Sequence, residues 1–561
     1  MTTVDSLETR RTNRDAAAIP VHAAVLDPAH LGDIHGALGS IAEDDFAPRK
    51  TFWARFKTLI AIVGPGLIVM VGDNDAGAFG TYTQAGQNYG TTLLWTLMLL
   101  IPVLYVNQEM VVRLGAVTGV GHARLILERF GRFWGAFSVI DLLLLNALTI
   151  VTEFIGISLA LRYLGLPQFW GVLASAAIIM IAVSTGNFRR FERFGIALVA
   201  GSLLLVPVLL IVHPPVGQLA ADFFVPKLPK DGKLSEVMLL IVAIVGTTVA
   251  PWQLFFQQSY IIDKRITPRF IRYERWDLCI GIVLVILGAI AMIGSSAAIF
   301  AGTPGFGNYT DALGTAIGLE KYAGRLPAVL FALALLDACI IGAAAVSLAT
   351  AYAIGDVFAA KHSLHRNLWD AKGFYAIYFG LILLAAVLVL TPGTPLGLLT
   401  NAVQTLAGVL LPSATVFLLL LSNDKDILGP WVNSKPLNLF TGAIVAALVM
   451  LSIILTASVL FPDLDAQWII GILIGGSVLA LVVTTSAKLY EFSACRNAMA
   501  PVQPRVREYE RDSWRMRPLR QLPPARLSVL SRVWMSVLRA YLVVAAGLVL
   551  LRIFQLATAG A

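Results

Sequence analysis

The sequence predicts an all-α polytopic membrane protein, and three observations support this fold class. Hydrophobic residues make up 57% of the 561 residues and charged residues only 14%, compared with roughly 45–50% and 25% in soluble domains. Apolar runs of about 20 residues, the length that crosses a bilayer, recur between Thr58 and Ala487. Two of these runs are interrupted at corresponding positions, which predicts two inverted repeats of five helices, with additional C-terminal helices. The composition excludes an ordinary soluble enzyme.

Twelve runs are predicted to span the membrane, and they divide the chain into five parts. The runs are 58–88, 91–112, 134–161, 168–184, 194–212, 234–262, 277–300, 326–359, 374–391, 396–421, 437–461 and 467–487. We expect a flexible cytoplasmic tail at 1–55, a core of ten helices at 56–425 and two additional transmembrane helices at 426–487. A basic cytoplasmic linker at 488–532 and an amphipathic or thirteenth transmembrane helix at 533–561 complete the chain.

The distribution of charge predicts the orientation in the membrane. The 42 basic and 34 acidic residues give a net charge of +8. Arg and Lys gather in alternate loops, such as 189–193, 264–275 and 361–372, and such loops are typically cytoplasmic. We therefore expect a multi-pass protein of the cell inner (plasma) membrane with a cytoplasmic N-terminus. The basic excess predicts no nucleic-acid surface, and the three cysteines form neither a disulfide framework nor a metal-binding spacing.

The two interrupted spans carry the polar residues that a bilayer disfavours. The first span contains Gly64-Pro65-Gly66 and then Asp73, Asn74 and Asp75 among glycines. The sixth contains the run from Gly246 to Gln253, in which Pro251 removes a backbone donor and frees a carbonyl one turn earlier. Free carbonyls and carboxylates at such breaks can replace the water shell of a cation. Alternatively, the acids only cap half-helices and the proline is only a kink.

Several blocks of the chain resemble the NRAMP family of divalent-metal transporters. The blocks are Gly64-Pro65-Gly66 with Asp75 and Gln84-Ala85-Gly86; Gln108 with Arg113-Leu114-Gly115 and Val117-Thr118-Gly119; Glu153 and Gly156; Arg190-Phe191-Glu192; Gly246 to Pro251; and Gln404 before Pro412. They cover roughly residues 56–425 in the order that the family has. The resemblance implies a LeuT-type inverted-repeat fold and a divalent cation as the transported substrate, with no cofactor.

This chain departs from two motifs of the family. In the Asp-Pro-Gly-Asn motif, Ala76 and Ala78 stand at the Pro and Asn positions. In the Met-Pro-His motif, Ala250 stands at the Met position and Trp252 at the His position. A thioether favours transition metals, whereas Mg²⁺ and Ca²⁺ prefer oxygen and water. The pattern is closest to the NRAMP-related magnesium transporters, a branch marked by the loss of that methionine.

The resemblance implies a metal site between the two broken helices. Asp75 is expected to be the anionic ligand, and main-chain oxygens near Gly72 and Thr247 and the amide of Gln404 are expected to be secondary contacts. Asp73 and Asn74 are expected to assist at the mouth of the site. Three positions, Ala78, Ala250 and Trp252, are expected to set selectivity.

Two further acids lie within predicted spans. Glu153 matches the family's third helix, but the acid that usually lies one turn before it is replaced by Ile150. Asp337 is an intramembrane acid by position, which makes a functional role the default hypothesis. For both residues a second-shell role beside the site and a structural hydrogen bond remain alternatives.

The sequence therefore predicts a membrane transporter for divalent cations and no enzyme. The preferred substrate is Mg²⁺, with Mn²⁺ also possible, moved by alternating access without proton coupling, because Trp252 and Gln257 replace the histidines expected on the sixth helix. The alternative is a proton-coupled Mn²⁺ or Fe²⁺ symporter. A metal-sensing receptor or membrane scaffold is the alternative from another class. The partners indicated are the cation and the lipid bilayer.

Overall fold

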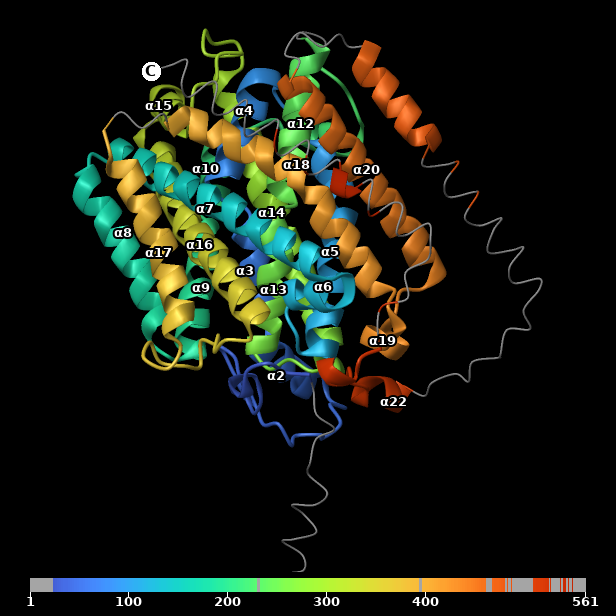
Figure 1. Ribbon diagram of the computed structural model, residues 1–561. Coiled ribbons are helices and arrows are strands. Elements are labelled where there is room, and N and C mark those ends of the chain that lie inside the picture. The colour runs from blue at the N-terminus through green and yellow to red at the C-terminus, as the bar shows by residue number, and fades with distance from the viewer. Residues whose placement is uncertain are drawn as a thin grey trace, which may run out of the picture.

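The chain folds into a bundle of long helices, shown by a computed structural model (Figure 1). The structure describes residues 24–229, 233–392, 396–460, 467–479 and 508–523, together with 482, 486, 525, 535, 538–540, 543 and 547. Among these residues, the only sheet is a two-stranded ribbon near the N-terminus. The predicted all-helical class is confirmed.

The elements follow one another in a simple order. The N-terminal part contains η1 (Pro28–His30), β1 (Ile34–His35) and β2 (Ser40–Ile41). The first half of the bundle contains α2 (Phe52–Ile62), α3 (Pro65–Val71), α4 (Ala76–Tyr89), α5 (Trp95–Thr118), α6 (His122–Phe130), α7 (Arg132–Tyr163), α8 (Gln168–Ser184), α9 (Phe188–Ser202), α10 (Leu205–Val212) and α11 (Val216–Phe224). The second half contains α12 (Leu234–Thr248), α13 (Pro251–Asp263), η2 (Pro268–Phe270), α14 (Ile271–Phe300), α15 (Ala312–Ala323), α16 (Arg325–Phe358), α17 (Lys372–Leu390) and α18 (Leu396–Ser422). The C-terminal part contains α19 (Lys425–Leu428), η3 (Gly429–Trp431), α20 (Lys435–Leu460), α22 (Glu508–Ser513) and η4 (Leu519–Gln521).

The predicted spans coincide with helices. In the part of the chain that the structure describes, eight helices are long and apolar enough to cross a membrane. A ninth candidate is the bent pair α2 and α3, and shorter apolar helices include Gln168–Ser184 and Gln467–Leu479. Figure 1 shows α8 and α17 on one side of the bundle and α20 on the other, with α18 crossing between them. The long helices α7 and α16 pack against each other, and α14 packs against α3 and α4.

The first span breaks twice. Between α2 and α3 the helix axis turns by 53° at Gly64. The backbone φ of Gly64 is +155°, a value that residues other than glycine rarely adopt. Pro65 then starts α3, where its missing N–H costs nothing. The second break separates α3 from α4, and Asp73 and Asn74 lie within it.

A buried ion pair holds the first bend. Lys264 Nζ lies 2.6 Å from Glu192 Oε1, and both side chains are inaccessible to solvent. The same ammonium group donates to the carbonyls of Ile62 and Val63, at 2.5 and 3.1 Å. Asp277 on α14 accepts from the N–H groups on the other side of the bend, those of residues 64 and 66. The bend is therefore fixed by charged groups from three other helices, and the carbonyls freed there are paired.

Residues 24–51, called the N-terminal cap from here on, fold against the helices, although we expected a flexible tail. The ribbon pairs Ile34 with Ile41 and His35 with Ser40. Glu192 Oε2 accepts from the N–H of Ala37 at 2.5 Å. Arginines of α9 and of the α13–α14 connection donate to cap carbonyls: Arg189 to Gly36, Arg193 to Ala37, and Arg265 to Ala29 and Asp33. These contacts come from residues far away in the sequence and replace the hydrogen bonds that a flexible segment would make with water.

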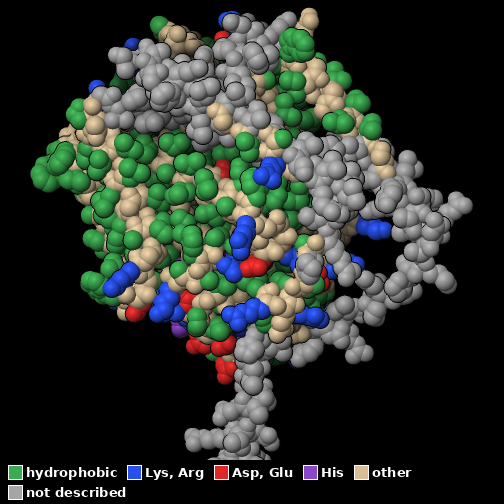
Figure 2. All heavy atoms as spheres, viewed as in Figure 1, with side chains coloured by type: hydrophobic (Ala, Val, Ile, Leu, Met, Phe, Trp, Pro, Cys, Tyr) green, Lys and Arg blue, Asp and Glu red, His purple; other side chains and the backbone are tan. Residues whose placement is uncertain are grey.

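The end of the molecule that carries the N-terminal cap, α2 and the α16–α17 connection is called the α2 side from here on. Figure 2 shows a broad band of hydrophobic side chains, with Lys, Arg, Asp and Glu gathered toward the α2 side. Such a band is the surface that a bilayer covers. The segment with α22 also packs on this side, where Trp431 Nε1 donates to the carbonyl of Arg511 at 2.9 Å. All of 488–507 and most of 526–561, including most of the predicted last helix, lie outside the described residues.

Candidate functional site

A cavity of about 40 Å³ lies between the two helix breaks. Its polar wall comes from Asp75 at the start of α4, Thr247 at the end of α12, and Thr149 and Thr152 on α7. The rest of the lining consists of Gly77, Leu145, Gly246, Ala250, Trp252, Val403 and Ala407. A single water needs about 10–15 Å³. The cavity is therefore large enough for an ion that keeps part of its water.

Asp75 is placed by the first turn of α4. It is the N-cap residue of this helix, and its Oδ1 accepts from the N–H of Ala78 at 2.9 Å. The side chain is 6% exposed and lines the cavity. In a continuous helix the N–H of Ala76 would bond to the carbonyl of Gly72, but here it donates to Glu153 Oε2 at 3.2 Å. The break thus gives the cavity one carboxylate and releases one carbonyl.

The second break supplies the facing wall. Helix α12 ends at Thr248 and α13 starts at Pro251, so residues 249 and 250 are not helical. Because Pro251 has no N–H, the carbonyl of Thr247 receives no bond from the next turn. Ala250 lines the cavity beside the freed carbonyl, and the indole of Trp252 is 1% exposed. The predicted break of the sixth span and its position opposite Asp75 are both present.

Asp73 belongs to a separate series of hydrogen-bonded side chains next to the cavity. Its Oδ1 accepts from Gln253 Nε2, and Gln253 Oε1 accepts from Gln108 Nε2 at 3.2 Å. Asp73 Oδ2 is buried and has no partner among the described residues. Close by, Tyr82 OH and Thr248 Oγ1 lie 2.6 Å apart. Asp73 is thus near the break, as predicted, but it does not line the cavity in this conformation.

Asn74 lies elsewhere than predicted. Its Nδ2 donates to the carbonyl of Val285 on α14 at 3.2 Å, so the side chain joins α14 rather than the mouth of the cavity. Gly72 and Ala78 also do not line the cavity. Ala78 is fully buried and contributes the N–H that Asp75 accepts. The side chain of Gln404 lies outside the described residues.

Of the two further acids, only Glu153 adjoins the site. Glu153 is fully buried, and its carboxyl group interacts with that of Asp75 as well as with the N–H of Ala76. Although Ile150 replaces the acid one turn before it, Glu153 thus has another acid, Asp75, as its neighbour. Asp337 faces Gly201 of α9 and does not line the cavity.

Sequence reasoning did not select several residues of the cavity wall. Thr149 and Thr152 are three residues apart, and this spacing places them on one face of α7. The apolar wall, made by Leu145, Val403 and Ala407, carries no signal that distinguishes it from ordinary packing. Only the fold brings these residues to the two breaks.

The chemistry of the site is that of oxygen ligands around a single carboxylate. No group of three or more His, Cys, Asp or Glu side chains that could hold a metal occurs among the residues that the structure describes. A cation beside Asp75 would therefore bind hydroxyl oxygens, main-chain carbonyls and water. Mg²⁺ characteristically binds in this way, through one or two carboxylates and retained waters.

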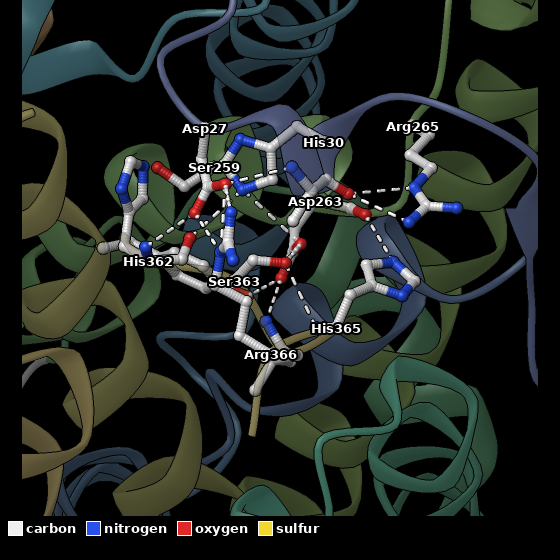
Figure 3. A network of polar contacts seen from close by, with 12 residues as sticks. Asp27, His30, Ser259, Asp263, Arg265, His362, Ser363, His365 and Arg366 are labelled. Carbon is white, nitrogen blue, oxygen red and sulfur yellow. Dashed lines mark hydrogen bonds and ion pairs between the residues drawn. The ribbon is translucent and has the colours of Figure 1, made fainter. Parts of the chain in front are cut away.

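A network of polar contacts lies on the α2 side of the bundle (Figure 3). Asp27 of the N-terminal cap accepts from Arg366 Nη2 at 2.5 Å and from the N–H of His362 at 3.0 Å. Asp263, at the end of α13, accepts from Ser363 Oγ at 2.5 Å and from the N–H of Leu364 at 2.8 Å. The network joins the cap, α13 and the α16–α17 connection.

His362 makes this network sensitive to pH. Burial opposes its charge, but Asp356 Oδ1, 3.0 Å from its Nε2, outweighs burial and raises the pKa of His362 to about 9. Burial keeps the pKa of its neighbour His30 below the usual value. A folded-state pKa above the unfolded value stabilises the fold fully below about pH 6.5, and this contribution is lost as the pH rises through about 9. The shift corresponds to at most about 3 kcal/mol.

We expect the melting temperature to fall between pH 6.5 and 9 for the wild-type protein and to change less for His362→Gln. Glutamine keeps a hydrogen-bonding side chain but has no proton to lose. Scanning fluorimetry in detergent across this pH range is the measurement, with His213→Gln, at an exposed position, as the control. Equal pH profiles for the wild type and His362→Gln would show that the Asp356–His362 pair does not stabilise the α2 side.

Comparisons with known proteins agree with this architecture. The family model named Nramp, natural resistance-associated macrophage protein-like, matches residues 66–458. The divalent metal cation transporter MntH of Burkholderia ambifaria is 28% identical over 412 residues, which cover 70% of this chain and 88% of the relative. The protein of the same name from Deinococcus radiodurans is 28% identical over 413 residues, with the same coverage.

Solved structures show the same fold. The crystal structure of the Eremococcus coleocola manganese transporter in complex with an aromatic bis-isothiourea substituted compound superposes with a TM-score of 0.62 at 21% identity. The match covers 81% of this chain and 97% of that chain. The predicted inverted repeat of five plus five helices is confirmed at the level of the fold.

Proposed function

Since this chain belongs to the Nramp family of divalent metal transporters, we propose that it carries its cation through the cavity between the α3–α4 and α12–α13 breaks. The observation that carries this proposal is the position of Asp75, whose carboxylate lines that cavity opposite freed carbonyls. A buried acid facing a cavity is costly unless it meets water or a cation. Asp75 is the countercharge, and Thr247 and the waters in the cavity complete the coordination.

Mn²⁺ is the cation that the relatives support. The two curated relatives described above are divalent metal cation transporters named MntH, and the solved structure is that of a manganese transporter. We expect the chain to carry Mn²⁺ with the same use of Asp75. This agrees with the alternative from the sequence more closely than with a transporter dedicated to magnesium.

Mg²⁺ is the second candidate, and the composition of the cavity supports it. Ala250 offers no thioether, and the described part of the lining contains no histidine. A site of oxygen ligands does not exclude a hard cation that keeps its waters. In this proposal Mg²⁺ and Mn²⁺ compete for the same cavity.

The energy source for transport is a separate question, with membrane potential alone and proton coupling as the two candidates. Membrane potential alone favours entry of a divalent cation by about 4.6 kcal/mol per 100 mV, which suffices for uncoupled transport. The contact between Asp75 and Glu153 favours proton coupling instead, because a second carboxyl group beside the metal ligand offers an acceptor for a proton when the cation binds. Glu153 is then the proton acceptor, and the histidines missing from α13 are not required.

Uptake into proteoliposomes with a pH dye inside tests these proposals. Mn²⁺ uptake with internal acidification, lost in Glu153→Gln, supports the coupled Mn²⁺ transporter. Mn²⁺ and Mg²⁺ uptake without acidification supports the uncoupled one. Absence of uptake of either cation would contradict the transport proposal and favour a sensing or scaffold role.

The orientation belongs to the same proposal. The basic loops of the α2 side, including the α13–α14 and α16–α17 connections, are of the kind that stays cytoplasmic. We therefore assign the α2 side to the cytoplasm and the bundle to the inner membrane. Labelling of a single cysteine at Lys425, on the α2 side, from outside intact cells tests this assignment, because a cytoplasmic position remains unlabelled.

Selectivity is expected to depend on Ala250. Ala250→Met places a thioether in the cavity lining and should raise the preference for Mn²⁺ over Mg²⁺ by about tenfold, or about 1.4 kcal/mol. Competition of the two cations for uptake is the measurement. Ala250→Leu is the matched control, since it adds similar volume without sulfur. An unchanged ion preference in Ala250→Met, or an equal change in both variants, would rule out a thioether effect.

A further inference from the structure

A second, smaller cavity lies directly beyond the first on the α2 side. It has a volume of about 10 Å³, enough for about one water-sized occupant. Leu145 lines both cavities, and consecutive residues of the α12–α13 break divide between them: Pro251 lines the second, and Ala250 and Trp252 line the first. The two cavities therefore adjoin at Leu145 and at the turn of the break.

The second cavity contains its own carboxylate. Asp141 lies on α7, eight residues before Thr149, which is about 12 Å along the helix. Its Oδ2 accepts from Ser413 Oγ of α18 at 3.2 Å, whereas its Oδ1 is buried and has no hydrogen-bond partner among the described residues. No Lys, Arg or His of the described part forms an ion pair with it. An acid in a membrane span, with one buried oxygen that has no partner among the described residues, marks a functional site by default.

Two hydroxyl groups accompany this carboxylate. Ser138 lies one turn before Asp141 on the same face of α7, and its Oγ donates to the carbonyl of Gly135 at 3.0 Å. Ser413 Oγ has the carbonyl of Leu410 at 2.8 Å as a second acceptor. Both hydroxyl oxygens keep lone pairs for a cation. The set consists of oxygen ligands only and matches the chemistry of the cavity beside Asp75.

Aromatic rings close the second cavity. Phe255 and Phe417 line it, and Phe417 contacts Trp134 with ring centroids 5.0 Å apart. Movement of these rings would connect Asp141 with the α2 side, while movement of Leu145 would connect it with Asp75. Asp141 is thus the next acid that a cation would meet after it leaves Asp75 toward the α2 side.

We propose that Asp141, with the hydroxyls of Ser138 and Ser413, is a second binding site for the transported divalent cation, occupied between its release from Asp75 and its exit. This inference rests on the proposed function and adds a second binding site to the transport path. A cation crossing from the first cavity would otherwise meet an apolar barrier with no countercharge on its far side.

The kinetics of Mn²⁺ uptake into proteoliposomes test the second binding site. Asp141→Asn should lower the maximal rate about tenfold and change KM less than about threefold, because loading at Asp75 is unaffected. Asp337→Asn is the matched control: it also removes an intramembrane acid with an unpartnered oxygen, but one that lines neither cavity. We expect it to transport within about twofold of the wild type. A wild-type rate in Asp141→Asn would overturn the proposal.

Mn²⁺ binding to the purified protein, followed by electron paramagnetic resonance of the free ion, separates this inference from the proposed function. The wild type should bind two ions, Asp75→Asn and Asp141→Asn one each, and the double variant none. Equal binding by the wild type and Asp141→Asn would refute the second site and leave Asp75 as the sole site. Loss of binding in Asp141→Asn with full binding in Asp75→Asn would refute the proposed function.

A second variant covers the case in which Asp141→Asn fails to fold. The double variant Ser138→Ala and Ser413→Ala retains the carboxylate, and we expect it to bind the second ion at least about tenfold more weakly than the wild type. Unchanged binding of the second ion would overturn the proposal.

Discussion

Asp75→Asn is expected to lower divalent-cation uptake about 100-fold or more, or about 2.7 kcal/mol, while the protein keeps its fold. Among the described residues, Asp75 is the only carboxylate that lines the cavity between the breaks, and the change removes it. Leaving a buried charge without its partner typically costs about 3–5 kcal/mol, here at the expense of the bound cation. Asparagine caps a helix about as well as aspartate, so α4 should still start at residue 76. Initial rates of Mn²⁺ and Mg²⁺ uptake by proteoliposomes are the measurement.

Asp311→Asn is the control for this prediction. Asp311 caps α15 in the same manner, with its Oδ1 2.7 Å from the N–H of Gly314, but it lines neither cavity. Uptake by this variant should remain within about twofold of the wild type. If Asp75→Asn and Asp311→Asn transport equally well, Asp75 acts only as a cap and the metal-site assignment is wrong.

Lys264→Met should give the largest loss of stability among the single changes considered. Methionine keeps much of the volume of the side chain but removes the positive charge that Glu192 faces at 2.6 Å. The carbonyls of Ile62 and Val63 lose their donor as well. Breaking a buried pair by removing one partner costs about 3–5 kcal/mol. A clear decrease in melting temperature by scanning fluorimetry is expected.

A double-variant cycle isolates the pair itself. Glu192→Gln removes the opposite charge, so Lys264→Met combined with Glu192→Gln should be less destabilising than the sum of the single variants. Lys321→Met, at an exposed position, should leave the melting temperature nearly unchanged. Additive effects of Lys264→Met and Glu192→Gln would mean that the two side chains contribute to the bend independently.

The breaks could be predicted because their causes are local. Pro65, Pro251 and the glycines around them interrupt a helix wherever the rest of the chain lies. Acids in an apolar run are costly, which indicated a cavity at Asp75 before any packing was known. The predicted helices and both breaks therefore agree with the structure, and Asp75, Thr247, Ala250 and Trp252 do line one cavity.

Other features depend on contacts between distant residues and carry no local signal. The N-terminal cap is polar and short of apolar runs, and its order comes from bonds such as that between Ala37 and Glu192. The direction of Asn74 is set by the carbonyl of Val285 on α14, since a non-helical break has no periodicity that fixes which way a side chain points. Asp141 was overlooked as a site, although its position within an apolar span was a signal of the same kind as that of Asp337.

The most direct test of the metal site is a crystal structure of the wild-type protein with Mn²⁺, using the anomalous scattering of the ion. The account predicts an anomalous peak beside the carboxylate of Asp75, in the cavity that Thr247 and Ala250 also line, and no peak there in Asp75→Asn. A peak that persists in Asp75→Asn, or an Mn²⁺ ion that occupies only sites remote from the two breaks, would contradict it.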